Sequence, residues 1–393
     1  MKDRACPLIV VAAAAAVLLS GCAADAPSPP ATGGASAAGA PGSATDGPAL
    51  DVEVVLDGLD VAWDVALTPE GTALITERGG RLFAHDDRGT REVEADLGDL
   101  FVGSEAGLMG LAVSPDFART RELFLCHATQ DGGQPQDVRV TRWRLSDDAA
   151  GAERTGTVVD GLPISSGRHS GCRLRFAPDG ALHVGTGDAA VGEHPQDPQS
   201  LGGKTLRVHP DGTVPRDNPF ADREGGGALV YTLGHRNVQG LAVQPGTGAL
   251  WSVEHGPDVD DEINVLEPGG NYGWDPVPGY DESVPMTDRE KFPDAVEAVW
   301  SSGRPTAATS GAVFLEGEQW GAWDGALAVA ELKNTGVGVH QVDGTRITGT
   351  TRMAELEDAH GRLRSLALDA EGALWVTTSN GDDDAVLRVT PRG

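Results

Sequence analysis

His169 and Asp188 are residues of the types that perform general-base catalysis. A neutral imidazole accepts a proton near pH 7, and a neighbouring carboxylate stabilises the imidazolium that forms. His169 lies in segment 168–173, RHSGCR, and Asp188 ends segment 185–188, GTGD. The alternative interpretation is a loop histidine that hydrogen-bonds to the backbone, which is the commoner role of an isolated histidine.

Further polar residues that could bind a ligand or a metal ion occur between residues 202 and 274. Arg236 and Asn237 stand in the run YTLGHRNVQG, where they either contact a ligand or pair with nearby acids. The acidic run 258–262 lies among Gly-Pro and Gly-Gly turns and suits a hard cation such as calcium. It lacks the EF-hand spacing, so a solvated acidic loop is the alternative. Segment 202–205, GGKT, lacks the first glycine of a phosphate loop and precedes no predicted helix, which excludes nucleotide binding there.

A repeated pattern indicates the elements that must position these residues. Alternating apolar residues, a turn related to Pro-Asp-Gly and a second β-rich run recur about every 45 to 70 residues. The six copies begin at Asp64, Gly110, Arg173, Gly240, Gly311 and Ser365. Each copy predicts a β-hairpin, and no long stretch has the 3.6-residue period of a helix. We therefore predict an all-β fold, a six-bladed β-propeller.

The two ends of the repeat region are expected to meet. A strand over 51–56 can pair with the last blade at 385–390 and close the ring. A row of β-sandwiches is the alternative fold, but it should show linkers between the repeats, and none is evident. In a propeller, functional residues lie on loops at one mouth of the central channel, where His169 and Arg236 would then belong.

Composition excludes several classes of function. Acidic residues outnumber basic ones by 59 to 30, and the formal net charge is −29. A nucleic-acid partner and charge-driven docking on anionic lipid are therefore disfavoured. No GxGxxG motif lies between a strand and a helix, which argues against a nicotinamide or flavin enzyme.

The N-terminus resembles a bacterial lipoprotein signal. An apolar run over 8–19 is too short to span a bilayer and leads into Leu-Ser-Gly-Cys, with Cys22 as the expected lipidation site. We predict a signal peptide over 1–21, a lipidated flexible tether over 22–50 and a folded domain over 51–393. The protein would be anchored by lipid on the extracytoplasmic side of a membrane in the cell envelope. A plain signal peptide that happens to contain Cys22 is the alternative.

The remaining cysteines fit an exported protein. After removal of Cys6 with the signal and lipidation of Cys22, the folded part keeps Cys126 and Cys172. An even pair in an oxidising compartment favours a disulfide, and two buried free thiols are the alternative. Since Cys126 ends one predicted strand and Cys172 opens the next blade, we expect a bond that joins neighbouring blades.

The order of the motifs resembles the pyrroloquinoline-quinone-dependent soluble sugar dehydrogenases, the glucose/sorbosone dehydrogenase-like family. The resemblance covers nearly all of residues 51–393 and includes TER at 76–78, GLMG at 107–110 and SPDF at 114–117. It continues through His169 with Asp188, the LGHRNxQG run, and DEIN followed by GGNYGW. It ends with Leu-Lys at 332–333 and RLR at 362–364. The six-bladed propeller of that family agrees with the repeat count.

This resemblance implies roles for individual residues. His169 matches the base that removes the proton of the sugar C1 hydroxyl, and Asp188 matches the acid that orients it. Arg236 matches a catalytic residue that contacts the quinone and stabilises charge on its oxygen. The other cofactor contacts implied are Glu105, Asn237, Lys333, Arg362 and Arg364, of which the last three supply cations for a tricarboxylate.

The resemblance also implies calcium. The backbone carbonyls of Gly256 and Pro257 match ligands of an ion that bridges to pyrroloquinoline quinone (PQQ) and polarises its reactive carbonyl. Glu262 and the carbonyl of Tyr272 match a second, structural calcium site. The expected reaction is the oxidation of aldose sugars to lactones, with electrons passed to an external acceptor.

Three residues depart from the glucose-oxidising members. Glu105 replaces a glutamine at a cofactor contact, Arg168 replaces an aspartate before the base, and Arg304 falls where an aromatic residue lines the pocket. They bear on the identity of the sugar rather than on the reaction class. The competing hypothesis is a non-catalytic propeller lipoprotein that binds a carbohydrate or a protein, although a binder has no reason to keep the whole catalytic set.

Overall fold

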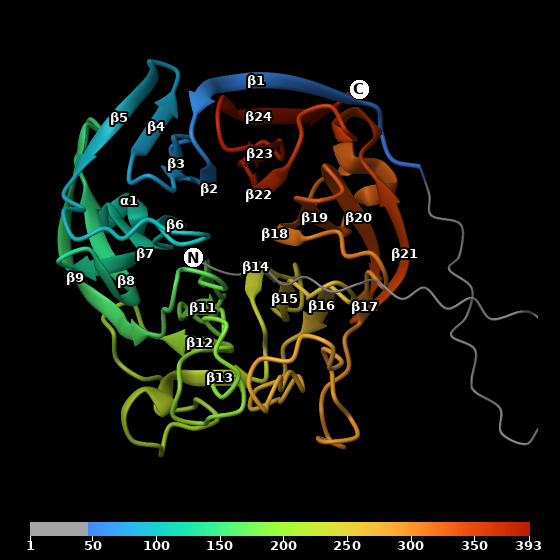
Figure 1. Ribbon diagram of the computed structural model, residues 1–393. Helices are drawn as coiled ribbons and strands as arrows, with labels where there is room; N and C mark the ends of the chain where they lie inside the picture. The colour runs from blue at the N-terminus through green and yellow to red at the C-terminus, as the bar shows by residue number, and fades with distance from the viewer. Residues whose placement is uncertain (1–45) are drawn as a thin grey trace, which may run out of the picture. The chain divides into compact units, whose positions relative to one another are not determined.

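Antiparallel strands arranged in a ring make up nearly all regular structure in residues 46–393, the part that the computed structural model describes (Figure 1). The predicted signal peptide, Cys22 and most of the tether lie outside the described residues. Within them, helical segments are short: α1 (Phe117–Thr120) and the 3-10 turns η1 (Gly225–Leu229), η2 (Glu318–Trp323) and η3 (Ala354–Leu356). No described helix has the length and apolar character needed to cross a membrane.

Three sheets consist of four antiparallel strands that follow one another along the chain. The first comprises β10 (Gly171–Phe176), β11 (Leu182–Thr186), β12 (Lys204–Val208) and β13 (Val230–Leu233). The second comprises β14 (Val238–Val243), β15 (Leu250–Glu254), β16 (Glu262–Val265) and β17 (Trp300–Ser301). The third comprises β18 (Thr309–Phe314), β19 (Leu327–Glu331), β20 (Gly336–Asp343) and β21 (Arg346–Arg352).

A fourth sheet joins the two ends of the chain's folded part. Its strands are β22 (Leu363–Leu368), β23 (Leu374–Thr378), β24 (Asp384–Pro391) and β1 (Leu50–Leu59). β1 pairs antiparallel with β24, with Asp51 opposite Thr390 and Glu53 opposite Arg388. The pairing expected from sequence is therefore confirmed. A row of sandwiches would leave these two strands apart, so that alternative is wrong.

The remaining strands form one sheet of eight. In chain order they are β2 (Ala62–Leu67), β3 (Ala73–Glu77), β4 (Leu82–Asp86), β5 (Gly89–Ala95), β6 (Leu108–Val113), β7 (Glu122–Asp131), β8 (Gln134–Leu145) and β9 (Gly151–Leu162). Two antiparallel groups, β2–β5 and β6–β9, meet where β5 and β9 pair in parallel at two positions. The hairpin pattern of the sequence did not indicate this lateral junction.

The strands β2, β6, β10, β14, β18 and β22 form the inner ring of the described structure. Each contacts the next, and β22 contacts β2. Every inner strand also carries a bulge or register shift near its first residue, where it pairs with the second strand of its sheet. A bulge inserts an extra residue and re-aims the neighbouring side chains. The shifts lie between Ala62 and Asp64, Leu108 and Leu111, Gly171 and Arg173, Val238 and Gly240, Thr309 and Ala312, and Leu363 and Ser365.

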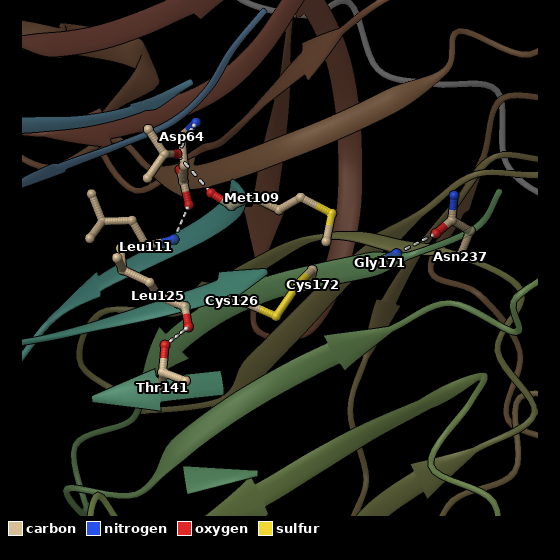
Figure 2. The surroundings of a disulfide bond; sticks show 10 residues. Asp64, Met109, Leu111, Leu125, Cys126, Thr141, Gly171, Cys172 and Asn237 are labelled. Carbon is tan, nitrogen blue, oxygen red and sulfur yellow. Dashed lines mark hydrogen bonds between the residues drawn. A yellow bond between two sulfur atoms is a disulfide. The ribbon is translucent and has the colours of Figure 1, made fainter. Parts of the chain in front are cut away.

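A disulfide between Cys126 and Cys172 joins two sheets (Figure 2). Cys126 lies in β7 of the eight-stranded sheet and Cys172 in β10 of the next, with a Cα–Cα distance of 5.7 Å. Both residues are fully buried. The expected bond is thus present, three residues after His169.

Replacing both cysteines with alanine should lower the free energy of unfolding by about 4 kcal/mol. The bond closes a loop with a sequence separation of 46 residues, and the chain-entropy model assigns that value to the restricted unfolded state. Urea unfolding of the oxidised protein and of the Cys126→Ala/Cys172→Ala variant measures the difference. Equal midpoints and slopes would show that the cross-link adds no stability. Unfolding of the reduced wild-type protein serves as the control, because it lacks the bond but keeps the packing of both cysteine side chains.

Candidate active site

The inner strands all begin at one end of the ring, which is called the mouth below. Residues near the third position of different inner strands contact one another: Arg173 in β10 pairs with Asp64 in β2 at 2.6 Å and donates to Ser365 Oγ in β22 at 3.0 Å. The strands therefore run in the same direction and their first residues share one end. Predicted site residues lie within the three residues before four of these strands: Glu105, His169, Arg236 with Asn237, and Arg362.

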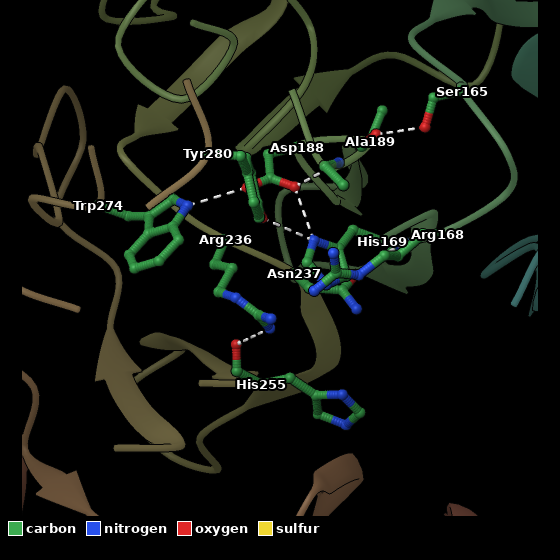
Figure 3. A network of polar contacts seen from close by, with 12 residues as sticks. Ser165, Arg168, His169, Asp188, Ala189, Arg236, Asn237, His255, Trp274 and Tyr280 are labelled. Atoms are coloured by element: carbon green, nitrogen blue, oxygen red, sulfur yellow. Dashed lines mark hydrogen bonds and ion pairs between the residues drawn. The ribbon is translucent and has the colours of Figure 1, made fainter. Parts of the chain in front are cut away.

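His169 and Asp188 form a buried pair at this mouth (Figure 3). His169 Nδ1 lies 2.8 Å from Asp188 Oδ1, and their side chains are 5% and 0% exposed. Asp188 follows β11 directly, so the hairpin of β10 and β11 brings the two residues together. The 19-residue separation in sequence thus becomes a direct contact.

Three further donors hold the Asp188 carboxylate. Trp274 Nε1 donates to Oδ2 at 2.9 Å, the Tyr280 hydroxyl donates to Oδ2 at 2.7 Å, and the Ala190 amide donates to Oδ1 at 2.8 Å. With four donors converging on it, Asp188 acts as an acceptor and keeps the His169 proton on Nδ1. Nε2 of His169 has no hydrogen-bond partner among residues 46–393 and is the nitrogen left to accept a proton.

Sequence reasoning missed the roles of Trp274 and Tyr280. Trp274 ends the GGNYGW run, which was a usable signal, whereas Tyr280 lies in a loop without any periodic pattern. The Tyr280 oxygen also lies 2.9 Å from His169 Nδ1. Burial and the adjacent Asp188 raise the pKa of Tyr280, so the phenol stays protonated and donates.

Glu105 accepts hydrogen bonds from two side-chain amides, one in β14 and one in the residue just before it. Asn237 Nδ2 lies 3.1 Å and Gln239 Nε2 3.2 Å from Glu105 Oε2. Burial favours the neutral acid, but neighbouring basic residues, the Asn237 hydrogen bond and the Arg364 guanidinium outweigh it and lower the pKa of Glu105. The structure therefore brings Glu105 and Asn237 together, as the resemblance implied, and adds Gln239.

Arg364 is a buried cation with neutral partners. Its Nε donates to Ser379 Oγ at 3.0 Å and its NH1 to Gln239 Oε1 at 3.3 Å, while the guanidinium stacks over Trp63. Burial lowers the pKa of Arg364 to about 10. Arg364 thus has no carboxylate partner in the described chain, which makes it suited to an anionic ligand.

Arg362 and Lys333 lie farther from this network. Arg362 is exposed and donates to the carbonyl of Ser379, the residue whose hydroxyl meets Arg364. Lys333 is exposed in the turn after β19, with Nζ 3.3 Å from Thr306 Oγ1. No hydrogen bond in residues 46–393 joins Lys333 to either arginine.

Arg236 lies between the base and a surface loop. Its NH1 donates to the His255 carbonyl at 3.0 Å, its NH2 pairs with Glu282, and its buried Nε has no partner in the described chain. Burial lowers the pKa of His255 to about 3, and Nε2 of that neutral ring is also buried and unpartnered. Arg168 pairs with the same Glu282 oxygen at 2.6 Å.

The predicted calcium ligands occupy two places. Gly256 and Pro257 follow β15, where the Gly256 amide donates to Asp261 Oδ1 at 2.9 Å. Glu262 begins β16, and its carboxylate meets Asn264 Nδ2 and the Thr287 hydroxyl rather than Tyr272. Burial and the neighbouring Glu254 raise the pKa of Glu262 to about 8. Residues 46–393 contain no cluster of three or more His, Cys, Asp or Glu side chains arranged to hold a metal.

Known proteins share this architecture over most of the chain. The aldose sugar dehydrogenase YliI of Escherichia coli is 33% identical over 353 residues, which are 87% of this chain and 93% of that protein. The apo structure of the soluble aldose sugar dehydrogenase from Escherichia coli covers 87% of this chain and 100% of its own, with 32% identity and a TM-score of 0.78. A PQQ-bound aldose sugar dehydrogenase from Streptomyces coelicolor covers 90% of this chain and 100% of its own, with 30% identity and a TM-score of 0.73.

The family assignment rests on the sequence as well as on these structures. The profile of the family described as glucose/sorbosone dehydrogenase matches residues 59–388, which include every strand from β2 to β23 and the whole mouth described above. The chain therefore belongs to the glucose/sorbosone dehydrogenase family.

Proposed function

We propose that this protein is a PQQ- and calcium-dependent dehydrogenase that oxidises aldose sugars at C1 to lactones. The observation that carries the proposal is the buried His169–Asp188 pair at the same mouth as the cations Arg236 and Arg364. A base alone is compatible with many reactions, but a base beside buried arginines, of which Arg364 forms no ion pair within residues 46–393, suits an oxidation with an anionic cofactor. The PQQ-bound relative from Streptomyces coelicolor supports the choice of cofactor.

The donor set at the mouth fits PQQ. Within residues 46–393, the buried Nε of Arg236 and Nε2 of His255 have no hydrogen-bond partner, and the hydrogen bonds of Arg364 go only to neutral groups. A tricarboxylate quinone would supply acceptors for all three groups, while Lys333 and Arg362 extend the cationic rim toward solvent. We assign cofactor binding to these residues together with Asn237 and Glu105.

The residues near β15 and β16 fit hard cations. Buried Glu262 has a raised pKa and lies beside a second carboxylate, Glu254, while Asn264 Oδ1 is buried without a hydrogen-bond partner among residues 46–393. A divalent ion would satisfy these oxygens and lower the pKa of Glu262 again. We assign one calcium ion to the carbonyls of Gly256 and Pro257, and a second to Glu262 and the carbonyl of Tyr272.

The chain's own residues would prepare the sugar for oxidation. His169 Nε2 accepts the proton of the C1 hydroxyl, and Asp188 stabilises the imidazolium through Nδ1–H. Trp274 and Tyr280 hold the carboxylate, so the imidazole keeps one orientation. When bound, PQQ would supply a two-electron acceptor for the C1 hydride, calcium would act as a Lewis acid beside it, and an external acceptor would be needed to reoxidise the cofactor.

We also propose that the ring is a six-bladed propeller. The two antiparallel halves of the eight-stranded sheet each have four strands, as the other four sheets do. β5 and β9 pair at only two positions, Glu94 with Gly151 and Ala95 with Ala152. If this short junction is regarded as a contact between blades, the halves count as two blades.

Reconstitution tests the function directly. Purified apoprotein is mixed with PQQ and calcium, and dye reduction is followed against a panel of aldoses. We expect turnover that needs both additions and disappears on chelation. Binding of a sugar without reduction of the dye, and without uptake of PQQ, would instead support the non-catalytic binding propeller.

Lys333→Ala should weaken PQQ binding. The variant loses one charge-assisted contact, worth about 1.5–3 kcal/mol or a factor of about 10 to 150 in the dissociation constant. Titration of apoprotein with PQQ, read by absorbance, gives the constant. Lys291→Ala removes an exposed lysine that pairs with Asp275 instead, and it serves as the control. Equal constants for wild type and Lys333→Ala would remove Lys333 from the cofactor site.

We propose that the protein is held at the extracytoplasmic side of a membrane through a lipid on Cys22. Cys22→Ser should then release the protein into the soluble fraction or leave its signal uncleaved, because a polar tether without acyl chains has no membrane affinity. Fractionation and mass spectrometry of the N-terminus distinguish these results. Unchanged membrane association with a cleaved N-terminus would contradict lipidation.

A further inference from the structure

A cleft of about 490 Å³ opens at the mouth beside the base, and arginines dominate its lining. Arg168, Arg236 and Arg304 line it, together with Pro257, Asp258, Val259, Glu282 and Ser283. This volume is within the usual range for small-molecule sites. Arg168 directly precedes His169 in the chain, so the cleft adjoins the catalytic pair.

The cleft already holds one carboxylate, from the protein's own loop. Glu282 Oε1 accepts hydrogen bonds from NH2 of Arg168, at 2.6 Å, and from NH2 of Arg236. The two guanidinium groups therefore converge on a carboxylate oxygen. Burial alone would favour the neutral acid, but the arginines lower the pKa of Glu282 to about 2 and keep it ionised.

One positive charge in the cleft remains without a partner. Three arginines face two acidic residues, Glu282 and Asp258, although the whole chain has a formal net charge of −29. Arg304 is exposed to the cleft and forms no hydrogen bond or ion pair with residues 46–393. A neutral sugar would leave the Arg304 guanidinium without an anionic partner in the cleft, whereas a sugar carboxylate would suit its donors.

We propose that this cleft selects aldoses that carry a carboxylate, the hexuronic acids, over neutral aldoses. The inference rests on the proposed function, because it deepens the assignment of the substrate at the same site. A hexuronate has its carboxylate at the opposite end of the carbon chain from C1. One molecule can therefore present C1 to His169 and its carboxylate to Arg304 and Arg168. The O–H and C1–H bonds break as in a neutral sugar, and the product is the lactone of an aldaric acid.

The test compares sugars that differ only at C6. Values of kcat/KM for D-glucuronate and D-glucose, and for D-galacturonate and D-galactose, are measured with the reconstituted holoenzyme. We expect each uronate to be preferred about tenfold or more, and the preference to shrink as salt is added. Arg304→Gln should reduce the uronate-to-neutral ratio about tenfold. Arg346→Gln changes an exposed arginine at the start of β21 whose side chain forms no ion pair with residues 46–393, and it should leave the ratio unchanged.

A binding measurement separates this inference from the proposed function. Calorimetric titration of the holoprotein with D-glucuronate should give a dissociation constant that weakens in Arg304→Gln and not in Arg346→Gln. Equal kcat/KM values for glucose and glucuronate would overturn the uronate inference while the dehydrogenase assignment stands. Uronate binding that depends on Arg304, without turnover of any aldose, would support the cleft and overturn the dehydrogenase.

Discussion

His169→Ala should reduce the turnover of aldose by about 10²- to 10⁴-fold, the usual contribution of a positioned general base. The variant loses Nε2 of His169, the nitrogen that the Nδ1 contact with Asp188 leaves free to accept a proton. It should still bind PQQ and calcium, because no predicted cofactor contact depends on the imidazole. Single-turnover reduction of bound quinone by excess aldose isolates this step from dye reduction.

The matched control for this variant is His209→Ala. His209 is an exposed histidine in the turn after β12, outside the mouth, and its replacement should leave the rate unchanged. Equal titration curves for PQQ show that both variants load the cofactor. If loaded His169→Ala reduces the quinone at the wild-type rate, another group is the base.

Asp188→Asn should cost nearly as much, about 10²- to 10⁴-fold in turnover. An asparagine can present its amide N–H to His169 Nδ1, which then becomes the acceptor, so the ring proton moves to Nε2. The nitrogen that faces the substrate is then protonated and cannot act as a base. The lost negative charge also removes the stabilisation of the imidazolium.

Tyr280→Phe provides a graded comparison for Asp188→Asn. It removes one of the four hydrogen-bond donors to the Asp188 carboxylate but keeps the charge of Asp188 and the aromatic ring at position 280. We expect a loss of turnover well below that of Asp188→Asn, with PQQ binding unaffected. The same measurement of single-turnover rates applies to both. A loss in Tyr280→Phe equal to that in Asp188→Asn would mean that orientation, rather than charge and tautomer, is what Asp188 provides.

The fold was largely predictable because its signals are local. Each hairpin has its own alternation and turn, so β10 with β11 or β22 with β23 follows from a short stretch of sequence. The closure by β1 was predictable because a strand was left at each end of the repeat region. The parallel junction between β5 and β9 was not, because it depends on how neighbouring sheets meet laterally, and no periodicity within either strand records that.

The site was predictable where it lies on the hairpins and not where it depends on loops. His169 and Arg236 lie within two residues of inner strands and Asp188 within two residues of β11, so a prediction of the strands also placed them. Tyr280 and Glu282 reach the mouth on the long connection between β16 and β17. The path of that connection is set by tertiary contacts such as those of Glu282 with Arg168 and Arg236.

The bulge at the start of every inner strand separates the site residues that precede the strand from the residues that follow the bulge. Side chains of a strand alternate between its two faces, so an inserted or deleted residue normally exchanges inward and outward positions along the whole strand. A bulge can accommodate one extra residue locally, so that the residues after it keep their faces. We therefore expect segments ahead of the bulges, such as 165–170 before β10, to tolerate a change in length of one residue without reversing the faces of the strand that follows. The ion pair of Asp64 with Arg173, which lies beyond the bulges of β2 and β10, would then be kept.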